Sequence, residues 1–143
     1  MDHVAFMKKS WGLTAKILRG QKRIESRWYS LRCRPWDGIK AGDTVYFKDS
    51  GEPIKLKAEV KKVIQFIDLT PSKVKEILNK YGADDGLEKG DISEFFERFK
   101  NKKYCILIFL QSPKVIKPLE IDKAGFGAMA AWITVNNILN IKK

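Results

Sequence analysis

Arginine and tryptophan side chains are concentrated in one stretch of the sequence, residues 10–36. This stretch holds five of the six arginines and three of the four tryptophans of the 143-residue chain. Nucleic-acid-binding proteins need fixed positive charge to meet phosphates, and flat rings on which unstacked bases can lie. Because both are present in one short window, residues 10–36 are the best candidate for a functional surface.

The most specific spacing in this stretch is the pattern formed by Gly20, Lys22, Glu25 and Arg27, in the string GQKRIESR. Glycine ends a helix in a left-handed turn at little cost, so Gly20 would turn the chain and place Lys22 beside a cleft. Glu25 and Arg27 are two residues apart on a predicted strand, so their side chains share one face. Arg27 would then offer its planar guanidinium to a phosphate or a base edge, with Glu25 orienting it.

Other roles for these side chains stay open. Glu25 would alternatively accept a hydrogen bond from the exocyclic amine of a base, or act with Lys22 as a catalytic acid–base pair. The simplest alternative is that Glu25 and Arg27 form only a surface ion pair, worth well under about 1 kcal/mol.

Aromatic residues near this pattern divide between core and surface. Trp28 shares a predicted strand face with Ile24, which favours the core. Trp36 lies in a polar loop with Arg32 and Arg34. We expect Trp36 to be exposed and to stack on a base, while the two arginines contact phosphates.

Two further aromatic residues have two open interpretations. Trp11 lies at the start of a predicted helix, and Phe126 lies between two glycines. Each would either line the cleft or pack into the core. With Lys123 from the basic end of the chain, the candidate residues for nucleic-acid binding are Gly20, Lys22, Arg27, Arg32, Arg34, Trp36 and Lys123.

Positive charge is unevenly distributed along the chain. The net charge is +11 and the isoelectric point is near 9.7, which favours an acidic partner, above all nucleic acid, with an anionic membrane surface as the second possibility. Residues 1–40 carry ten Lys or Arg against three acidic residues, and residues 68–101 carry six against eight. The two ends of the chain would form one basic face. The alternative is that the lysines only solvate the surface.

Hydrophobic periodicity predicts short strands, one early helix and a helical insert. The expected strands are 3–8, 22–29, 45–48, 54–66 with a bulge at 61–62, a fully buried 103–110, and a last apolar segment at 131–135. The expected helices are 10–19 capped by Ser10, 70–81 started by Thr70 and Pro71, and 91–100 with its phenylalanines in the core.

Short strands with non-local pairing predict an α+β fold around a small, mostly antiparallel β-barrel, with a two-helix insert at about 68–101. A chain of this length can bury one proper core, so we expect a single domain over residues 1–143.

The pattern G-x-K-x-x-E-x-R in this chain resembles the signature of ASCH domains (activating signal cointegrator homology), a branch of the PUA-like superfamily. Gly20, Lys22, Glu25 and Arg27 match all four positions. The string IKAGD that starts at residue 39 is similar to the family's turn into its next strand, and Tyr104–Leu110 to its closing strand. The resemblance implies a β-barrel with a cleft beside the helix–strand junction, and a role in RNA-related processes.

The resemblance also implies an enzymatic alternative. A bacterial group similar to this chain hydrolyses N4-acetylcytidine with a lysine and a threonine from this motif, and other ASCH proteins are ribonucleases. Lys22 matches that lysine, whereas Glu25 stands where these hydrolases carry threonine. This departure favours binding over catalysis.

We therefore expect a nucleic-acid-binding domain that holds single-stranded or modified RNA in a basic cleft. One alternative is a nucleoside-processing enzyme, with Lys22 and Glu25 as its catalytic residues. The other is a protein-interaction module that docks a partner through the acidic insert at 68–101.

Cysteine and histidine usage predicts no metal site and no cofactor. Cys33 and Cys105 lie far apart in the sequence, and His3 is the single histidine. The sequence has no stretch typical of a signal peptide or a membrane span. We expect a cytoplasmic monomer with no membrane partner.

Overall fold

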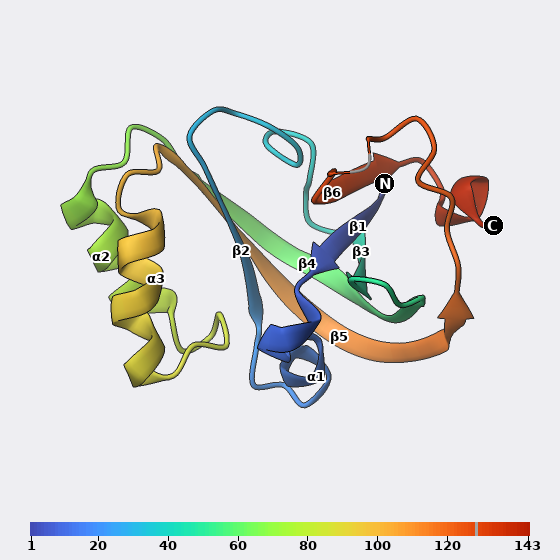
Figure 1. The fold of residues 1–143 in the computed structure, drawn as a ribbon, viewed down its shortest axis with the longest axis horizontal. Helices are drawn as coiled ribbons and strands as arrows, with labels where there is room; N and C mark the ends of the chain where they lie inside the picture. The colour runs from blue at the N-terminus through green and yellow to red at the C-terminus, as the bar shows by residue number, and fades with distance from the viewer. Residues whose placement is uncertain (128) are drawn as a thin grey trace.

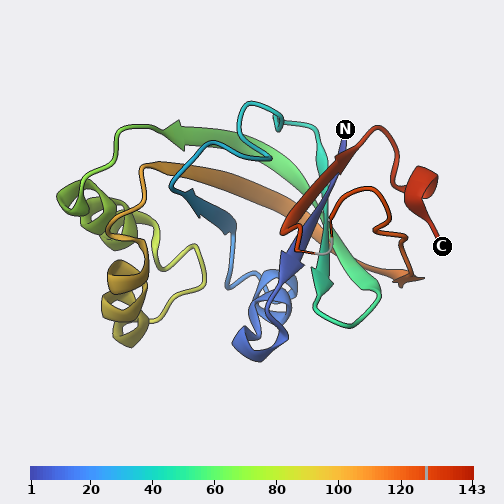
Figure 2. The ribbon, with the colours of Figure 1, turned by 45° about the horizontal axis from the view of Figure 1, so that its top comes forward.

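The computed structural model describes residues 1–127 and 129–143. Six strands form one mixed sheet in the order β2-β5-β4-β3-β1-β6. Their bounds are β1 Asp2–Met7, β2 Ile24–Tyr29, β3 Thr44–Asp49, β4 Ile54–Phe66, β5 Tyr104–Leu119 and β6 Trp132–Val135. Neighbouring strands are antiparallel except for β1 and β3, which run parallel. The long strands curve the sheet into a half-barrel (Figures 1 and 2), which confirms the predicted α+β, mostly antiparallel fold.

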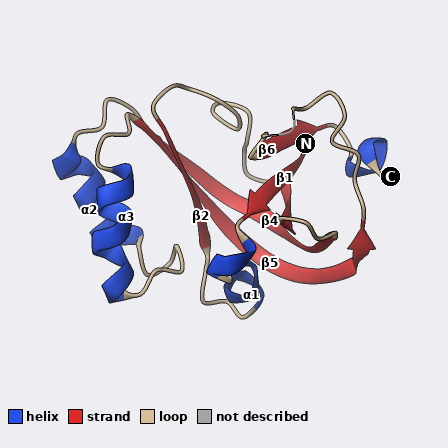
Figure 3. Cartoon of the chain, viewed as in Figure 1, coloured by secondary structure: helices blue, strands red, loops and turns tan. Residues whose placement is uncertain are grey.

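Three α-helices accompany the sheet in the described part of the chain: α1 Leu13–Leu18, α2 Pro71–Tyr81 and α3 Ile92–Phe99. Figure 3 shows α2 and α3 side by side at one end of the long strands, with α1 apart from them. Short 3-10 turns cover Lys9–Trp11, Lys89–Asp91 and Ile138–Ile141. None of the helices described is long and apolar enough to cross a membrane.

Strand β4 follows from its alternating sequence. Ile54, Leu56, Ala58 and Val60 are buried on one face, and the residues between them are exposed or half-buried. Because the period of a strand is two, one face packs on the core. The pairing with β5 shifts register between Val60 and Lys62, which confirms the predicted bulge.

Strand β5 is longer than predicted, because it continues through Pro113 and Pro118 to Leu119. Only its first part, up to Phe109, pairs with β2 in the described sheet. Beyond that point, one edge of β5 has no neighbouring strand among residues 1–127 and 129–143. Proline is tolerated on such an edge because no ladder partner needs its missing N–H.

Helix α1 is shorter than predicted, and Ser10 does not cap it. Ser10 lies inside the 3-10 turn Lys9–Trp11, and Gly12 then adopts a left-handed φ of 64° before the helix begins at Leu13. That conformation breaks the helical path, which divides the predicted helix into two pieces.

The acidic insert folds as predicted at its start. Thr70 accepts a hydrogen bond from the backbone N–H of Lys73 at 3.2 Å, and Pro71 occupies the first turn of α2. The three phenylalanines of α3 were expected in the core but are only half-buried, against the buried cluster around Trp28. Phe95 and Phe99 border an open pocket instead of a closed interior.

A buried hydrogen-bond chain ties β1 to β6 and to the turn before β3. His3 is fully buried, and its Nε2 lies 2.9 Å from Asp43 Oδ2. Its Nδ1 accepts from Trp132 Nε1 at 3.1 Å, so Nε2 carries the proton and donates it to Asp43. The Arg27 guanidinium lies 5.1 Å from the centre of the Trp132 ring, so this chain of contacts reaches Arg27 on β2.

Candidate functional site: a pocket along the edge strand β2

Lys22 is the centre of a buried charged cluster between the motif and the insert. Its Nζ donates to Asp85 Oδ1 at 2.6 Å, to the Asp85 carbonyl at 2.7 Å and to the Ile24 carbonyl at 2.7 Å. Glu25 Oε1 lies 3.2 Å from the same ammonium. Only 2% of the Lys22 side chain is exposed, so its N–H groups are committed to protein partners.

Glu25 orients Arg27, as the spacing predicted. Arg27 Nε and Nη2 both donate to Glu25 Oε2, at 2.9 and 2.7 Å. The guanidinium also donates to the carbonyls of Ala131 and Phe6, at 3.2 and 3.3 Å. Because Glu25 is buried, this is an anchored pair rather than the surface pair of the simplest alternative.

The cluster continues to the other face of β2 through Ser26. Ser26 Oγ donates to Asp85 Oδ2 at 2.6 Å and accepts from Trp28 Nε1 at 3.1 Å. Trp28 stacks on Phe99 of α3, with ring centres 5.0 Å apart and planes 6° apart. One connected network therefore joins an aromatic wall to a charged floor.

Two buried carboxylates share the single ammonium of Lys22, and their pKa values separate. Burial alone would lower the pKa of Lys22, but the charges of Asp85 and Glu25 outweigh it and raise that pKa. Burial acts to raise the pKa of Glu25, but Arg27 and then Lys22 lower it below its ordinary value. Burial raises the pKa of Asp85, and the negative charge of Glu25 adds to this against the opposing effect of Lys22. Lys22 and Glu25 are thus held ionised, and Asp85 is the group nearest to accepting a proton.

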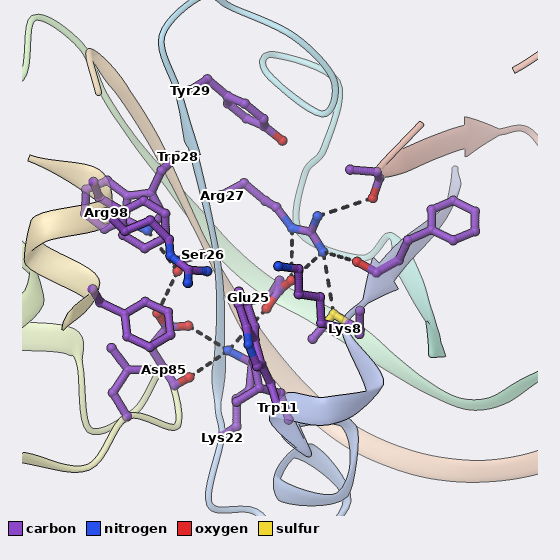
Figure 4. Close-up of a pocket in the computed structure, with 17 residues that line it drawn as sticks. Lys8, Trp11, Lys22, Glu25, Ser26, Arg27, Trp28, Tyr29, Asp85 and Arg98 are labelled. Atoms are coloured by element: carbon purple, nitrogen blue, oxygen red, sulfur yellow. Dashed lines mark hydrogen bonds and ion pairs between the residues drawn. The ribbon is translucent and has the colours of Figure 1, made fainter. Parts of the chain in front are cut away.

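These residues form the floor of a pocket of about 360 Å³ that runs along β2 (Figure 4). In the described sheet β2 is an edge strand, paired with β5 on one side only. The pocket occupies the other side, between the start of α1 and the insert. It is lined by four acidic, basic or hydroxyl side chains at its base, Lys22, Glu25, Ser26 and Asp85, and by aromatic walls that include Trp28, Tyr29, Phe95 and Phe99.

The mouth of the pocket carries positive charge around one exposed ring. Trp11 is 38% exposed and meets Phe95 edge-on, with ring centres 5.8 Å apart. Lys8 Nζ lies 5.0 Å and the Arg98 guanidinium 4.8 Å from the centre of the Trp11 ring. The pocket therefore has a buried network with no net charge at its base and exposed cations at its mouth.

The structure brings together four of the candidate residues, Lys22, Glu25, Arg27 and Trp11, which all line this pocket. Gly20 has the expected left-handed φ, 76°. Arg32 and Arg34 are exposed on the loop after β2 and are outside the pocket lining. The interpretation of Trp28 as a core residue is confirmed, since it is 8% exposed within a buried cluster.

Trp36 is not the exposed ring that the sequence predicted. It is half-buried against the core and meets Tyr104 edge-on, with ring centres 5.3 Å apart. The Arg32 guanidinium lies over both rings, at 5.7 and 5.4 Å. Trp36 is half-buried because it packs against residues that are distant in the sequence, such as Tyr104, although its neighbours in the loop are polar.

Phe126 packs against a buried cluster around Val4 and Ile133, so the core interpretation applies and the cleft interpretation is wrong. Lys123 Nζ lies 4.3 Å from the centre of the Phe6 ring, beside the pocket and outside its lining.

The pocket residues that sequence reasoning missed include Asp85, Ser26, Arg98 and Lys8. Asp85 is 63 positions from Lys22 and is one of eight acidic residues in the insert, so nothing in the sequence links the two. The one local signal is the glycine that follows it, Gly86, which adopts a left-handed φ of 87° in the structure. Arg98 is the one arginine outside residues 10–36. Across residues 1–127 and 129–143, no three His, Cys, Asp or Glu side chains gather closely enough to hold a metal ion.

No protein-family model matches the sequence, and a search of curated proteins finds no match. Solved structures do match. The ASCH protein of Zymomonas mobilis superposes with a TM-score of 0.65 at 14% identity, over 99% of this chain and 96% of the other. A point mutant of that protein gives a TM-score of 0.68 at 14% identity, over 97% and 91%. The N-terminal domain of Staphylothermus marinus McrB gives 0.52 at 14% identity, over 81% and 74%. These likenesses establish a shared fold.

Proposed function

We propose that this chain, which has the ASCH fold that its motif predicted, binds single-stranded nucleic acid by taking one base into the pocket along β2. RNA is the proposed ligand ahead of DNA, and a modified base is included among the bases taken. The observation that carries the proposal is the pocket of about 360 Å³ that pairs aromatic walls with a buried polar floor.

The shape and chemistry of this pocket favour a flat heterocycle. Aromatic side chains, among them Tyr29, Phe95 and Phe99, line the walls, and such walls suit the apolar face of a base. Glu25, Asp85 and Arg27 supply acceptors and a donor for a base edge, and the bonds from Lys22 to Asp85 and from Arg27 to Glu25 fix them in place.

Electrostatics favours an anionic chain beyond the base. The floor is neutral, because two carboxylates face Lys22 and Arg27. The mouth adds Lys8 and Arg98, and the whole chain carries +11. A neutral base therefore fits the floor, and phosphates fit the rim and the surface outside it.

A variant that fills the pocket tests the proposal. Ala131 lines the pocket and is itself exposed, so Ala131→Trp would obstruct the site with little cost to the fold. Ala41→Trp, at an exposed turn outside the pocket, is the matched control. We expect Ala131→Trp to raise the Kd for a labelled single-stranded RNA, measured by fluorescence anisotropy, by at least about 10-fold, and Ala41→Trp to leave it unchanged.

The same titration with DNA of the same sequence tests the preference for RNA. Equal affinities would reject that preference but leave the pocket proposal standing. Binding that is unaffected by Ala131→Trp, or no binding at low salt, would reject the pocket proposal.

A hydrolase acting on an acylated base or on RNA is the second candidate. The observation that favours it is the position of Lys22 between two carboxylates at the base of a pocket. Because its pKa is raised, Lys22 would stay cationic and hold the two carboxylates in place, while one of them takes a proton from the attacking water. Asp85, with its raised pKa, suits that base better than Glu25.

Product analysis separates binding from turnover. The protein and its Lys22→Ala variant are incubated with N4-acetylcytidine and with labelled RNA. Release of acetate or cleavage of RNA by the native chain alone would support the hydrolase. Turnover that survives the loss of Lys22 would reject it.

A further inference from the structure

The mouth of the pocket holds a second aromatic site, separate from the base-sized wall inside. Trp11 is the most exposed of the aromatic residues that line the pocket, at 38%. It is held in the 3-10 turn Lys9–Trp11 and rests edge-on against Phe95, so its orientation is fixed by both sides of the mouth. A fixed exposed ring is the element that sequence-tolerant binders of single strands use to stack a base.

Two cations flank this ring. Lys8 Nζ and the Arg98 guanidinium lie within about 5 Å of the Trp11 ring centre, in the usual range of cation–π contacts. Both side chains line the pocket. The acidic neighbour of Arg98 is Glu94 at 3.9 Å, and both of these side chains are largely exposed, so this pair is weak.

Lys8 and Arg98 lie where a nucleic-acid chain with one base in the pocket would have to leave it. A base inside the pocket connects to its neighbour through one phosphate, and that phosphate has to cross the mouth. Lys8 and Arg98 stand at the mouth, whereas Lys22 is engaged deep inside by Asp85. The cations that can exchange their contact with Trp11 for a phosphate are therefore at the rim.

We propose that the mouth is a second nucleotide subsite, in which Trp11 stacks the base next to the one in the pocket and Lys8 and Arg98 bind the phosphate between them. This inference rests on the proposed function and deepens it. The ligand is then a strand of at least two nucleotides, and a free nucleoside fills only half of the site.

The test compares ligands of increasing length on the full chain. Calorimetric titrations use a nucleoside, the matching dinucleoside monophosphate and the matching tetranucleotide, first for the native chain and then for Lys8→Gln/Arg98→Gln. In the native chain we expect the second nucleotide to lower Kd by at least about 10-fold, and in the double variant we expect that gain to be lost. The slope of log K against log salt for the tetranucleotide should shrink by about 0.7 for each phosphate contact removed.

Two matched controls make the comparison specific. Lys80 also lies over a ring, at 5.3 Å from the centre of Tyr81 on α2, outside the pocket lining, so Lys80→Gln removes an equivalent charge elsewhere. Trp11→Leu should abolish the gain from the second nucleotide, and Trp11→Phe should restore most of it, because phenylalanine keeps the stacking face.

The outcomes separate the two proposals. If the nucleoside binds but the second nucleotide adds nothing, or if the gain survives loss of Lys8 and Arg98, the second subsite is wrong and the base pocket stands. If neither the nucleoside nor the oligonucleotides bind, the proposed function itself is wrong.

Discussion

A lysine that is 2% exposed between two carboxylates is costly to keep, because three charges have left water. Hydrogen bonds from Lys22 to Asp85 and to two carbonyls compensate for this cost. The same contacts fix the positions of both carboxylates at the base of the pocket. Removing the ammonium would leave negative charges buried together, and that consequence can be measured.

Lys22→Met should lower the free energy of unfolding by about 3–5 kcal/mol, because the variant leaves Asp85 and Glu25 without their shared cation. Urea denaturation at neutral pH measures this change. Lys80→Met, at an exposed site on α2, is the control and should stay within about 0.5 kcal/mol of the native chain. A loss below about 1 kcal/mol for Lys22→Met would contradict the buried network.

His3 should make the protein less stable as the pH falls from 7 to 5. Burial lowers the pKa of His3 in the folded chain below its ordinary value of 6.5, against the opposing effect of Asp43. The unfolded chain therefore takes up a proton below about pH 6.5 that the folded chain refuses, and this favours unfolding. The urea midpoint, measured at several pH values, should fall over this range.

The variant His3→Gln isolates this effect, because His3 is the single histidine of the chain. Its stability should no longer fall between pH 7 and 5, whatever its level. The pKa of Asp85 is raised, so Asp85 makes the protein more stable as the pH falls, which is opposite to the effect of His3. Asp85 is present in both the native chain and the variant. The hydrogen bond from His3 and those from Lys40 hold the pKa of Asp43 at about 2, against its usual 3.8 and the effect of burial, so its contribution is lost only at lower pH. A flat native profile would contradict the buried neutral histidine.

At the scale of elements, two glycines with left-handed φ border the motif and differ in what surrounds them. A Cβ at Gly20, with φ 76°, would meet nothing within 4 Å. A Cβ at Gly86, with φ 87°, would lie 3.2–3.3 Å from the side chain of Lys22. The first position needs glycine for its backbone alone, and the second also for the close approach of the insert to the motif.

Gly20→Ala should therefore cost about 1 kcal/mol of stability and leave ligand binding intact. Gly86→Ala should cost more, about 2–3 kcal/mol, and should also weaken binding, because it displaces Lys22. Thermal unfolding and anisotropy on the same samples make the comparison. Equal effects of the two variants on binding would show that the approach of Gly86 does not position the floor.

The sequence predicted those elements whose signals are local. Alternation in β2 separated Glu25 and Arg27 from Ile24 and Trp28, because a strand has a period of two. Thr70 and Pro71 marked the start of α2 by their capping chemistry. The contact between Lys22 and Asp85 could not be predicted, because it depends on how the insert returns to the sheet. The half-buried position of Trp36 depends in the same way on Tyr104, which is distant in the sequence.

At the scale of the whole molecule, the positive charge outside the pocket and the pocket itself should contribute separately to ligand binding. The Arg32 and Arg34 side chains are exposed outside the pocket, and the chain carries +11. Charge outside a site attracts any phosphate chain and carries no preference between bases.

Arg32→Ala/Arg34→Ala should weaken binding of single-stranded RNA by a similar, few-fold factor for every base composition, and should reduce the salt dependence. Anisotropy titrations with homopolymers of the four bases, at several salt concentrations, measure both quantities. A loss confined to one base would instead place these arginines at a base-reading site.

The order in which the chain is synthesised has a consequence for the edge strand β2. Residues 24–29 are synthesised well before their partner strand, which begins at Tyr104, and before Asp85, the counter-charge of Lys22. A chain synthesised only as far as residue 80 therefore carries the complete motif with neither its hydrogen-bonding strand nor the counter-charge of Lys22. The motif therefore precedes its partner strand and its counter-charge in the order of synthesis, so a chain that ends between them would carry an unsatisfied, adhesive edge.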